Sequence, residues 1–343
     1  MSVIEKIIPE KYVVGFQDTF HTLEEELQHG LVLYWNTAAE ILDGSGINLL
    51  DPEPSYFSIE RNFFSALFLY SYFRADIPHS RRVLYAAVNQ CLRGMVTGCD
   101  NILDDEYKKT LDTDLPEKAF RFRSVLDIMV SDRILFTLLH RGNIAGDLTA
   151  AQVADGSAES LRALTKSGVQ EASEEGGTGG HLKPEAVLEK VHHYKTGILF
   201  QCPWRVPGVI ESRNDDIISQ LKNALYRIGM GCQIFDDMVD LPMDIKMNRH
   251  NYVASLIRHG SSLSERFRLE QNFSNDIKQK ENADLLFDFP EARRTAGKKA
   301  LAYLEEGTSM LFASEHEFMI PYAISFCAAR IGAERYLFDI DTK

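Results

Sequence analysis

Apolar residues recur at helical spacing along most of the chain. In the segment that begins at Phe63, apolar or small side chains stand at positions i, i+1, i+4, i+5 and i+8, which places them on one broad helix face. Segments that begin at Val88 and Ile217 repeat the pattern, and we expect one or two more helices over residues 311–340. Alternating Val, Ile and Thr runs bounded by two-residue turns are hard to find. The sequence therefore predicts an all-α fold.

Gly, Pro and Asp residues interrupt this helical pattern and predict loops. The expected loops lie at residues 43–46, 51–54 and 112–116, because these residue types favour turns. The clearest break, residues 174–184, holds four glycines. Its composition fits a linker between domains or a mobile loop beside a site, and both interpretations stay open.

Composition and charge exclude several classes of protein. The chain has 343 residues, 37 Lys and Arg against 50 Asp and Glu, and a net charge of −13. This acidic balance argues against a nucleic-acid partner, but an anionic substrate stays possible because metal ions reverse the local charge. The five cysteines show no spacing typical of a disulfide framework or a zinc site. Without a signal sequence or a membrane-spanning apolar run, we expect a cytoplasmic protein with no transmembrane segment.

The first segment that carries candidate chemistry is Asp-Asn-Ile-Leu-Asp-Asp-Glu at residues 100–106. It follows an apolar helical stripe, so Asp100 and Asp104 are expected on one helix face, one turn apart. Two like charges there cost a few tenths of a kcal/mol, roughly, unless a cation binds between them. Taken alone, this pattern is more typical of a solvated helix end, and the role of Asp105 stays open.

A second acidic cluster has the pattern DDxxD and begins at Asp236. Asp236, Asp240 and Asp244 repeat every four residues, although Pro242 is expected to end the helix before the third. The roles of Asp237 and Asp244 are left open. Carboxylates suit Mg²⁺, which shares its ligand shell between protein oxygens and substrate phosphates. Two facing acidic helices of this kind would hold several ions bridged by a diphosphate.

A lysine lies between the two acidic clusters, in the segment His-His-Tyr-Lys-Thr-Gly at residues 192–197. A lysine that opens an apolar run is usually a surface residue with a buried stem. Beside a metal–diphosphate site, Lys195 would instead bind phosphate oxygens. For His192 and His193 we expect surface or packing roles rather than ligand roles.

In order and spacing, these motifs resemble the trans-isoprenyl diphosphate synthase (polyprenyl synthetase) family of the class I isoprenoid synthase superfamily, over roughly residues 58–260. The resemblance implies that two Mg²⁺ ions bind Asp100 and Asp104 and that a third binds Asp236 with support from Asp240. It also implies that three further residues lie near the reacting groups. Lys195 would bind the diphosphate, and Thr196 and Gln233 would line the reaction zone.

The resemblance also implies a fold and an activity. The fold is one large helical bundle around a deep apolar cavity, a single domain over residues 1–343 with residues 174–184 as a loop within it, usually in a homodimer. The activity is Mg²⁺-dependent condensation of an allylic prenyl diphosphate with isopentenyl diphosphate, with release of diphosphate. Electrostatic stabilisation and an apolar, water-poor cavity supply most of what such a carbocation path requires.

Departures from the family pattern concentrate at the second-substrate site. The second aspartate of the first motif is Asn101, and the upstream basic motif keeps only Arg61. The paired arginines after the first motif are replaced by Lys108 and Lys109, and Lys246 remains from a lysine-rich stretch. These four cations and Lys195 are the candidate substrate-binding residues. The residues expected to bind the allylic diphosphate are nearly all present, whereas few of the basic residues expected to bind the second substrate are.

This asymmetry keeps three alternatives open beside condensation. A class I terpene cyclase or lyase uses one prenyl diphosphate, and the four-residue repeat of Asp236, Asp240 and Asp244 has the spacing of its second metal motif. Head-to-head condensing enzymes share an acidic motif like residues 100–105 but lack the Lys-Thr pair. A non-catalytic subunit of a hetero-oligomeric prenyl synthase would explain the missing basic residues. Product chain length is not predicted.

Overall fold

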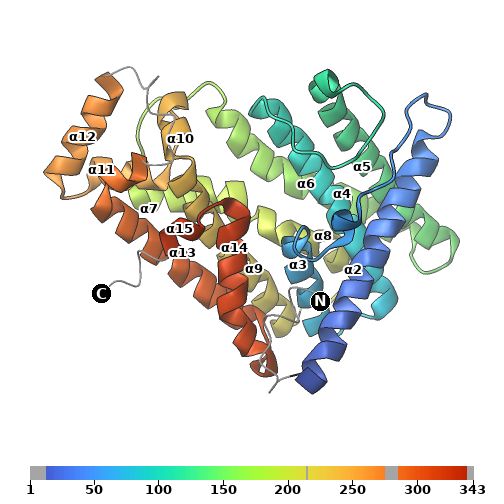
Figure 1. Cartoon of the computed structure of the whole chain (residues 1–343). Coiled ribbons are helices and arrows are strands. Elements are labelled where there is room, and N and C mark those ends of the chain that lie inside the picture. Colours follow the sequence, from blue (N-terminus) through green and yellow to red (C-terminus); the bar gives the residue numbers. More distant parts are fainter. Residues whose placement is uncertain (1–12, 214, 275–284, 338–343) are drawn as a thin grey trace. The chain divides into compact units, whose positions relative to one another are not determined.

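The computed structural model describes residues 13–213, 215–274 and 285–337 (Figure 1). Helices dominate these residues and no strand occurs among them beyond an isolated bridge between Leu49 and Thr113. The predicted all-α fold is therefore confirmed. The chain divides into two compact units: unit 1 contains residues 1–164 and 202–218, and unit 2 contains residues 165–201 and 219–343.

Unit 1 contains the predicted helices that begin near Phe63 and Val88. Its elements are α2 (Val13–Leu42), η2 (Pro54–Phe57), α3 (Phe63–Arg74), α4 (His79–Leu103), η3 (Glu117–Ala119), α5 (Phe120–Ile144), α8 (Arg205–Glu211) and the first part of α6 (Ala150–Glu174). The predicted loops at residues 43–46 and 112–116 fall between these elements.

Helices α4 and α5 pack closely because α4 carries glycine at the contact. A Cβ atom on Gly98 would lie 2.7 Å from the backbone oxygen of Ser124, and one on Gly94 would lie 2.1 Å from Ser131 Oγ. Any larger side chain would push the helices apart. This contact fixes the course of α4, at whose C-terminal end the first acidic motif lies.

Unit 2 contains the rest of α6, the first half of η5 (Leu199–Trp204) and most of α9 (Asp216–Val239). Its other elements are α7 (Pro184–Val187), the π-helix η4 (Leu188–Gly197), α10 (Leu241–Met247), α11 (Tyr252–His259), α12 (Leu263–Ser274), η7 (Leu285–Asp288), α13 (Pro290–Leu311), η8 (Ser314–Met319), α14 (Ile320–Ile331) and α15 (Glu334–Leu337). Of the predicted region 311–340, residues 338–340 lie outside the described residues, and the rest holds α14 and α15.

The prediction that the second-motif helix ends before Asp244 is confirmed. Helix α9 ends at Val239, and Pro242 lies in the first turn of α10, where its missing N–H costs no helical hydrogen bond. The backbone N–H groups of Asp240 and Asp244 still bond to carbonyl oxygens four residues back, at 2.8 and 2.9 Å. Asp236, Asp240 and Asp244 therefore keep helical spacing across the break.

The glycine-rich loop forms hydrogen bonds with the residue that follows α10. Gly177 adopts a left-handed conformation with φ of 80°, which favours glycine. Beside it, the backbone N–H of Thr178 donates to the Asn248 oxygen at 2.9 Å, and Asn248 Nδ2 donates to the Thr178 oxygen at 2.6 Å. The loop, which leads from α6 to α7 along the chain, is therefore also hydrogen-bonded to the end of α10, inside unit 2.

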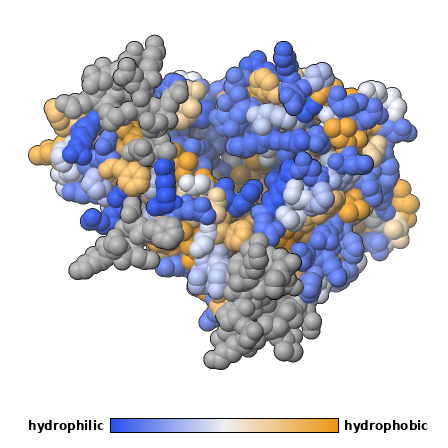
Figure 2. All heavy atoms as spheres, viewed as in Figure 1, coloured by the Kyte–Doolittle hydropathy of each residue, from blue (hydrophilic) through white to orange (hydrophobic). Residues whose placement is uncertain are grey.

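None of the helices in the described ranges is long and apolar enough to cross a membrane. The face drawn in Figure 2 carries many hydrophilic residues, with apolar residues between them. The single domain over residues 1–343 and the deep apolar cavity stay predictions.

Candidate functional site

In unit 2, helices η4 and α9 approach each other through glycine. A Cβ atom on Gly197 would lie 2.5 Å from the Tyr226 ring, and one on Gly229 would lie 2.9 Å from the backbone oxygen of Thr196. The close approach brings the Lys-Thr pair of η4 against the helix that carries the second acidic motif. π-Helical segments of this kind occur frequently at functional sites.

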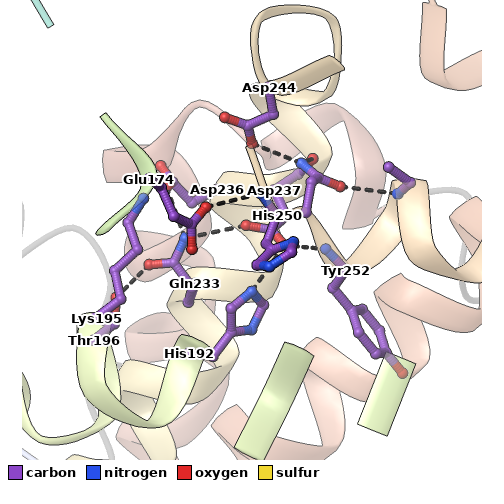
Figure 3. Close-up of polar contacts among 12 residues, drawn as sticks. Glu174, His192, Lys195, Thr196, Gln233, Asp236, Asp237, Asp244, His250 and Tyr252 are labelled. Atoms are coloured by element: carbon purple, nitrogen blue, oxygen red, sulfur yellow. Dashed lines mark hydrogen bonds and ion pairs between the residues drawn. The ribbon is translucent and has the colours of Figure 1, made fainter. Parts of the chain in front are cut away.

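A chain of hydrogen bonds follows from this approach (Figure 3). The hydroxyl of Thr196 donates to Gln233 Oε1. Gln233 Nε2 donates to Asp236 Oδ2 and to Asp237 Oδ1, each at 3.1 Å. The structure thus brings together Thr196, Gln233 and Asp236, three of the residues that the sequence singled out.

Lys195 lies among carboxylates. Its Nζ atom is 3.3 Å from Glu171 Oε1. Burial alone would lower the pKa of Lys195, but Glu171, Asp236, Asp244 and Asp237 together raise it. Lys195 therefore stays protonated at physiological pH. Glu171 belongs to no motif, and nothing in the sequence singled it out.

The negative charges around Asp236 outweigh the positive charge of Lys195. Burial, with the nearby Asp240 and Asp237 carboxylates, raises the pKa of Asp236 to about 7, against the opposing effects of Lys195 and Gln233. Burial and the carboxylate of Asp237 also raise the pKa of Asp244. The cluster thus has an excess of negative charge that a bound cation would relieve.

Asp237, the second residue of DDxxD, points into the interior of unit 2. Its side chain accepts from His192 Nε2 at 2.9 Å and from the backbone N–H of Tyr252, as Figure 3 shows. Asp237 and His192 are only 2% and 1% exposed. The expected packing role of His192 is thereby confirmed, whereas Asp240 is exposed.

In unit 1, the first acidic motif lies at the end of α4, as predicted. Helix α4 ends at Leu103 and Asp104 is its C-cap, with a backbone N–H that bonds to the Asp100 oxygen at 2.8 Å. Asp100 is half-buried and Asp104 is exposed. Asp105, whose role the sequence left open, forms an exposed ion pair with Arg121 at 2.8 Å.

Asn101, the departure from the family's second aspartate, has a structural partner. It is fully buried. Its Nδ2 donates to the Lys108 backbone oxygen at 3.0 Å, and its Oδ1 accepts from the Lys108 N–H at 2.8 Å. Aspartate at this position would lack the donor, so asparagine is the residue that closes the turn after α4.

Two of the predicted substrate-binding cations lie at one cavity of unit 1. The cavity has a volume of about 140 Å³, and its lining comprises Trp35, Pro52, Glu53, Tyr56, Arg61, Lys109, Thr110 and Asp112. Lys109 Nζ is 2.6 Å from Asp112 Oδ2. Lys108 is not among the lining residues and pairs with Glu106 at 2.5 Å, while Lys246 is exposed on α10 in unit 2.

A third cation near this cavity, Arg93, was not found from the sequence. Arg93 Nη1 donates to Asn62 Oδ1 at 2.8 Å. Burial raises the pKa of Tyr56, which lines the cavity, and the charges of Arg93 and Arg61 oppose that rise. Both guanidinium groups therefore act on the same phenol.

The acidic residues fit Mg²⁺ by donor type and by charge. Within the part of the chain that the structure describes, no three His, Cys, Asp or Glu side chains form a group able to hold a metal by themselves. Mg²⁺ bound through one or two carboxylates and substrate phosphates needs no such group. The raised pKa of Asp236 indicates that the unit 2 cluster favours a cation.

The expectation that the two acidic motifs face one another across one site stays a prediction. Asp100 and Asp104 belong to unit 1, and Asp236 and Asp240 belong to unit 2. Within each unit the motif keeps the spacing that the sequence predicts.

Comparison with known proteins supports the resemblance. Residues 142–259 match the family model "Polyprenyl synthetase". No curated protein sequence matches the chain. The fold is similar to geranylgeranyl pyrophosphate synthetase from Pyrococcus horikoshii, with 16% identity, a TM-score of 0.58 and coverage of 95% of this chain and 100% of that one.

Two further solved structures have a similar fold. A polyprenyl synthetase from Streptomyces coelicolor has 15% identity and a TM-score of 0.58, with 90% and 98% of the two chains covered. Octaprenyl pyrophosphate synthase from Helicobacter pylori has 13% identity and a TM-score of 0.54, with 93% and 100% covered. The predicted resemblance is confirmed: the chain carries the polyprenyl synthetase sequence pattern over residues 142–259 and shares its fold with polyprenyl synthetases over most of its length.

Proposed function

We propose that this protein is a Mg²⁺-dependent prenyltransferase that joins an allylic prenyl diphosphate to isopentenyl diphosphate and releases diphosphate. The observation that carries the proposal is the linked group in unit 2, in which Lys195, Thr196, Gln233 and Asp236 lie within one set of hydrogen bonds and charge interactions. The family match, which includes all four residues, points to the same activity.

The residues of unit 2 bind the leaving group. The protonated ammonium of Lys195 donates to diphosphate oxygens, and its ion pair with Glu171 directs the side chain while the substrate is absent. Thr196 and Gln233 hold Asp236 in position. Mg²⁺, three ions in this proposal, held by Asp100, Asp104, Asp236 and Asp240, would supply positive charge as the carbon–oxygen bond breaks.

The cavity at Arg61 and Lys109 supports a second substrate. A second diphosphate would compete with Asp112 for Lys109 in this recess, whereas a protein that ionises a single diphosphate needs no second recess. Arg61 and Lys109 line the recess and Arg93 lies near its Tyr56 wall, so together they replace part of the family's basic motif. A second diphosphate there would be held by charge-assisted hydrogen bonds.

A single-substrate cyclase or lyase is the second candidate. The observation in its favour is that Asp244 continues the helical spacing of Asp236 and Asp240 and accepts from Asn251 Nδ2 at 2.8 Å. A non-catalytic subunit is the third candidate. For such a subunit, folded protein would show no turnover.

One experiment separates these candidates. The purified protein is incubated with Mg²⁺ and allylic diphosphates of 10 to 20 carbons, with and without labelled isopentenyl diphosphate, and the products are separated by chromatography. We expect label in a longer prenyl diphosphate. A hydrocarbon or alcohol formed without the second substrate would establish the cyclase instead, and no turnover would favour the subunit.

Two controls test the metal and the site. EDTA is expected to abolish turnover, and Mg²⁺ to restore it. Asp236→Asn and Asp100→Asn are each expected to reduce turnover by about 100-fold or more, because each removes a charged metal ligand. Asp43→Asn, which removes an exposed carboxylate after α2, is the matched control for the loss of one charge.

The homodimer and the cytoplasmic location belong to the same proposal. Exposed apolar side chains on α5 support a second copy as the partner. None of the five cysteines forms a disulfide in the part of the chain that the structure describes, the state expected in a reducing compartment.

A further inference from the structure

The pair of His192 and Asp237 is the most deeply buried polar contact of the unit 2 site. We propose that this pair acts as a positioning element, which sets the Lys195 segment of η4 against α9, and that Asp237 takes no part in metal binding. The kinetic part of this inference rests on the proposed prenyltransferase function. The structural part stands on the geometry alone.

Every oxygen of the Asp237 carboxylate is engaged by a donor of the protein. Oδ1 accepts from Gln233 Nε2 at 3.1 Å, and Oδ2 accepts from His192 Nε2 at 2.9 Å and from the Tyr252 backbone N–H. A metal at this carboxylate would displace these donors and leave them buried without partners, which is costly. Asp236, the preceding residue, instead accepts from one side-chain donor, Gln233, which it shares with Asp237.

The pair joins three elements of unit 2. His192 lies in η4, three residues before Lys195, while Asp237 lies in α9 and Tyr252 is the first residue of α11. The anionic carboxylate at the start of α11 is favourable because the helix dipole is positive there. Asn251 Nδ2 extends the contact, since it donates to the Asp237 backbone oxygen at 2.7 Å and to Asp244 Oδ2 at 2.8 Å.

The contact assigns a hydrogen to one ring nitrogen of His192. Because Asp237 Oδ2 can only accept when ionised, the hydrogen must be carried by His192 Nε2. Nδ1 is buried and has no hydrogen-bond partner among the described residues. The contact therefore requires a hydrogen on Nε2 of the imidazole, and nitrogen chemical shifts report that hydrogen directly.

Four variants test the proposal. His192→Leu removes the donor, whereas His192→Gln keeps an N–H in reach of Asp237 and serves as the conservative rescue. Asp237→Asn places an amide against two donors. Asp236→Asn is the matched comparison, because it makes the same chemical change one residue away, at a proposed metal ligand.

The first readout needs neither metal nor substrate. In EDTA, His192→Leu and Asp237→Asn are expected to lower the melting temperature by about 5 °C or more, while His192→Gln lowers it by less than about 2 °C. Asp236→Asn is expected not to lower it, because that carboxylate lies among like charges. Nitrogen NMR of the wild type should show a hydrogen on Nε2 of His192.

The second readout is the rate and its dependence on Mg²⁺. His192→Leu and Asp237→Asn are expected to reduce kcat by about 10- to 100-fold, as loss of a supporting hydrogen bond does. The Mg²⁺ concentration for half-maximal rate should change less than about threefold in both, and rise more than about tenfold in Asp236→Asn. His192→Gln should retain most of the rate.

Two results would overturn the inference. One is an Asp237→Asn enzyme whose Mg²⁺ requirement rises as much as that of Asp236→Asn, which would make Asp237 a ligand. The other is a His192→Leu protein with unchanged melting temperature and kcat. If the wild type shows no prenyl transfer, the proposed function fails, while melting and NMR still decide on the pair.

Discussion

Asp236 and Asp237 are neighbours in α9 with identical side chains, and their surroundings give them different properties. Asp236 lies beside Asp240, Asp237 and Lys195, and its pKa is raised to about 7. Asp237 is buried among three donors. The rotation of 100° between successive helix residues places one at the cation-favouring side of α9 and the other in the packing of η4 and α11.

At the residue scale, Arg61 separates condensation from single-substrate chemistry. Arg61→Gln is expected to raise the KM for isopentenyl diphosphate by about 10- to 100-fold, because a charge-assisted hydrogen bond is lost. The KM for the allylic substrate should stay unchanged. Steady-state kinetics measure both. Lys118→Gln, which removes an exposed cation of η3 in the same unit, is the control, and an equal effect on both substrates would count against the assignment.

A second prediction concerns Asp127, which is 1% exposed in α5. Burial raises its pKa to about 7, above the value near 3.9 in unfolded chains. The proton is thus held more tightly in the folded state, so the stabilisation is complete below about pH 4 and is lost as the pH rises to about 7. Over this window wild-type stability should fall by up to about 1.4 kcal/mol per pH unit relative to Asp127→Asn.

Urea unfolding of both proteins at several pH values measures this difference. Asp43→Asn, at an exposed position, controls for the change in net charge. A difference between wild type and Asp127→Asn that stays constant from pH 4 to 7 would show that Asp127 does not titrate in this range.

At the element scale, glycines set the helix contacts that carry both motifs. Gly98→Ala is expected to lower the free energy of unfolding by about 1–3 kcal/mol, because its Cβ would meet the Ser124 backbone oxygen at 2.7 Å. Gly168→Ala in α6 is the matched control. No atom lies within 4 Å of its Cβ position, so helix propensity should raise stability by up to about 1 kcal/mol.

Denaturant titration compares the two glycine variants. Because α4 ends at the first acidic motif, Gly98→Ala should also reduce the prenyl transfer rate, whereas Gly168→Ala should not. Equal stability changes in the two variants would mean that α4 and α5 tolerate a wider separation.

At the scale of the whole molecule, α5 offers a surface for a second copy of the chain. Phe122, Val125, Met129 and Phe136 are 39–63% exposed and spaced by three, four and seven residues along one face. A stripe of this kind can pair with itself across a two-fold axis, which buries apolar surface on both copies.

Met129→Asp is therefore expected to convert the dimer into monomer, because it places a charge in the middle of this stripe. Sedimentation equilibrium should give twice the chain mass of 38.9 kDa for the wild type and one chain mass for the variant. Met243→Asp, at another exposed methionine, in α10, should stay dimeric. A monomeric wild type at micromolar concentration would disprove the dimer.

Sequence patterns predicted the helices and the position of each motif along them. The stripes at Phe63, Val88 and Ile217 correspond to α3, α4 and α9, since helical periodicity depends on residues within a few positions of one another. Pro242 predicted the end of α9 before Asp244, but not the new helix α10, whose first turn also accommodates a proline.

The sequence by itself therefore determined an all-α chain with two acidic motifs, a Lys-Thr pair and a depleted basic motif. Tertiary structure alone decided which of these residues meet. It placed Glu171 beside Lys195, Arg61 beside the Lys109 cavity, and Asn101 and Asp237 in buried hydrogen bonds. The reason is that spacing fixes which face of a helix a side chain occupies, whereas the partner on that face comes from a distant part of the chain.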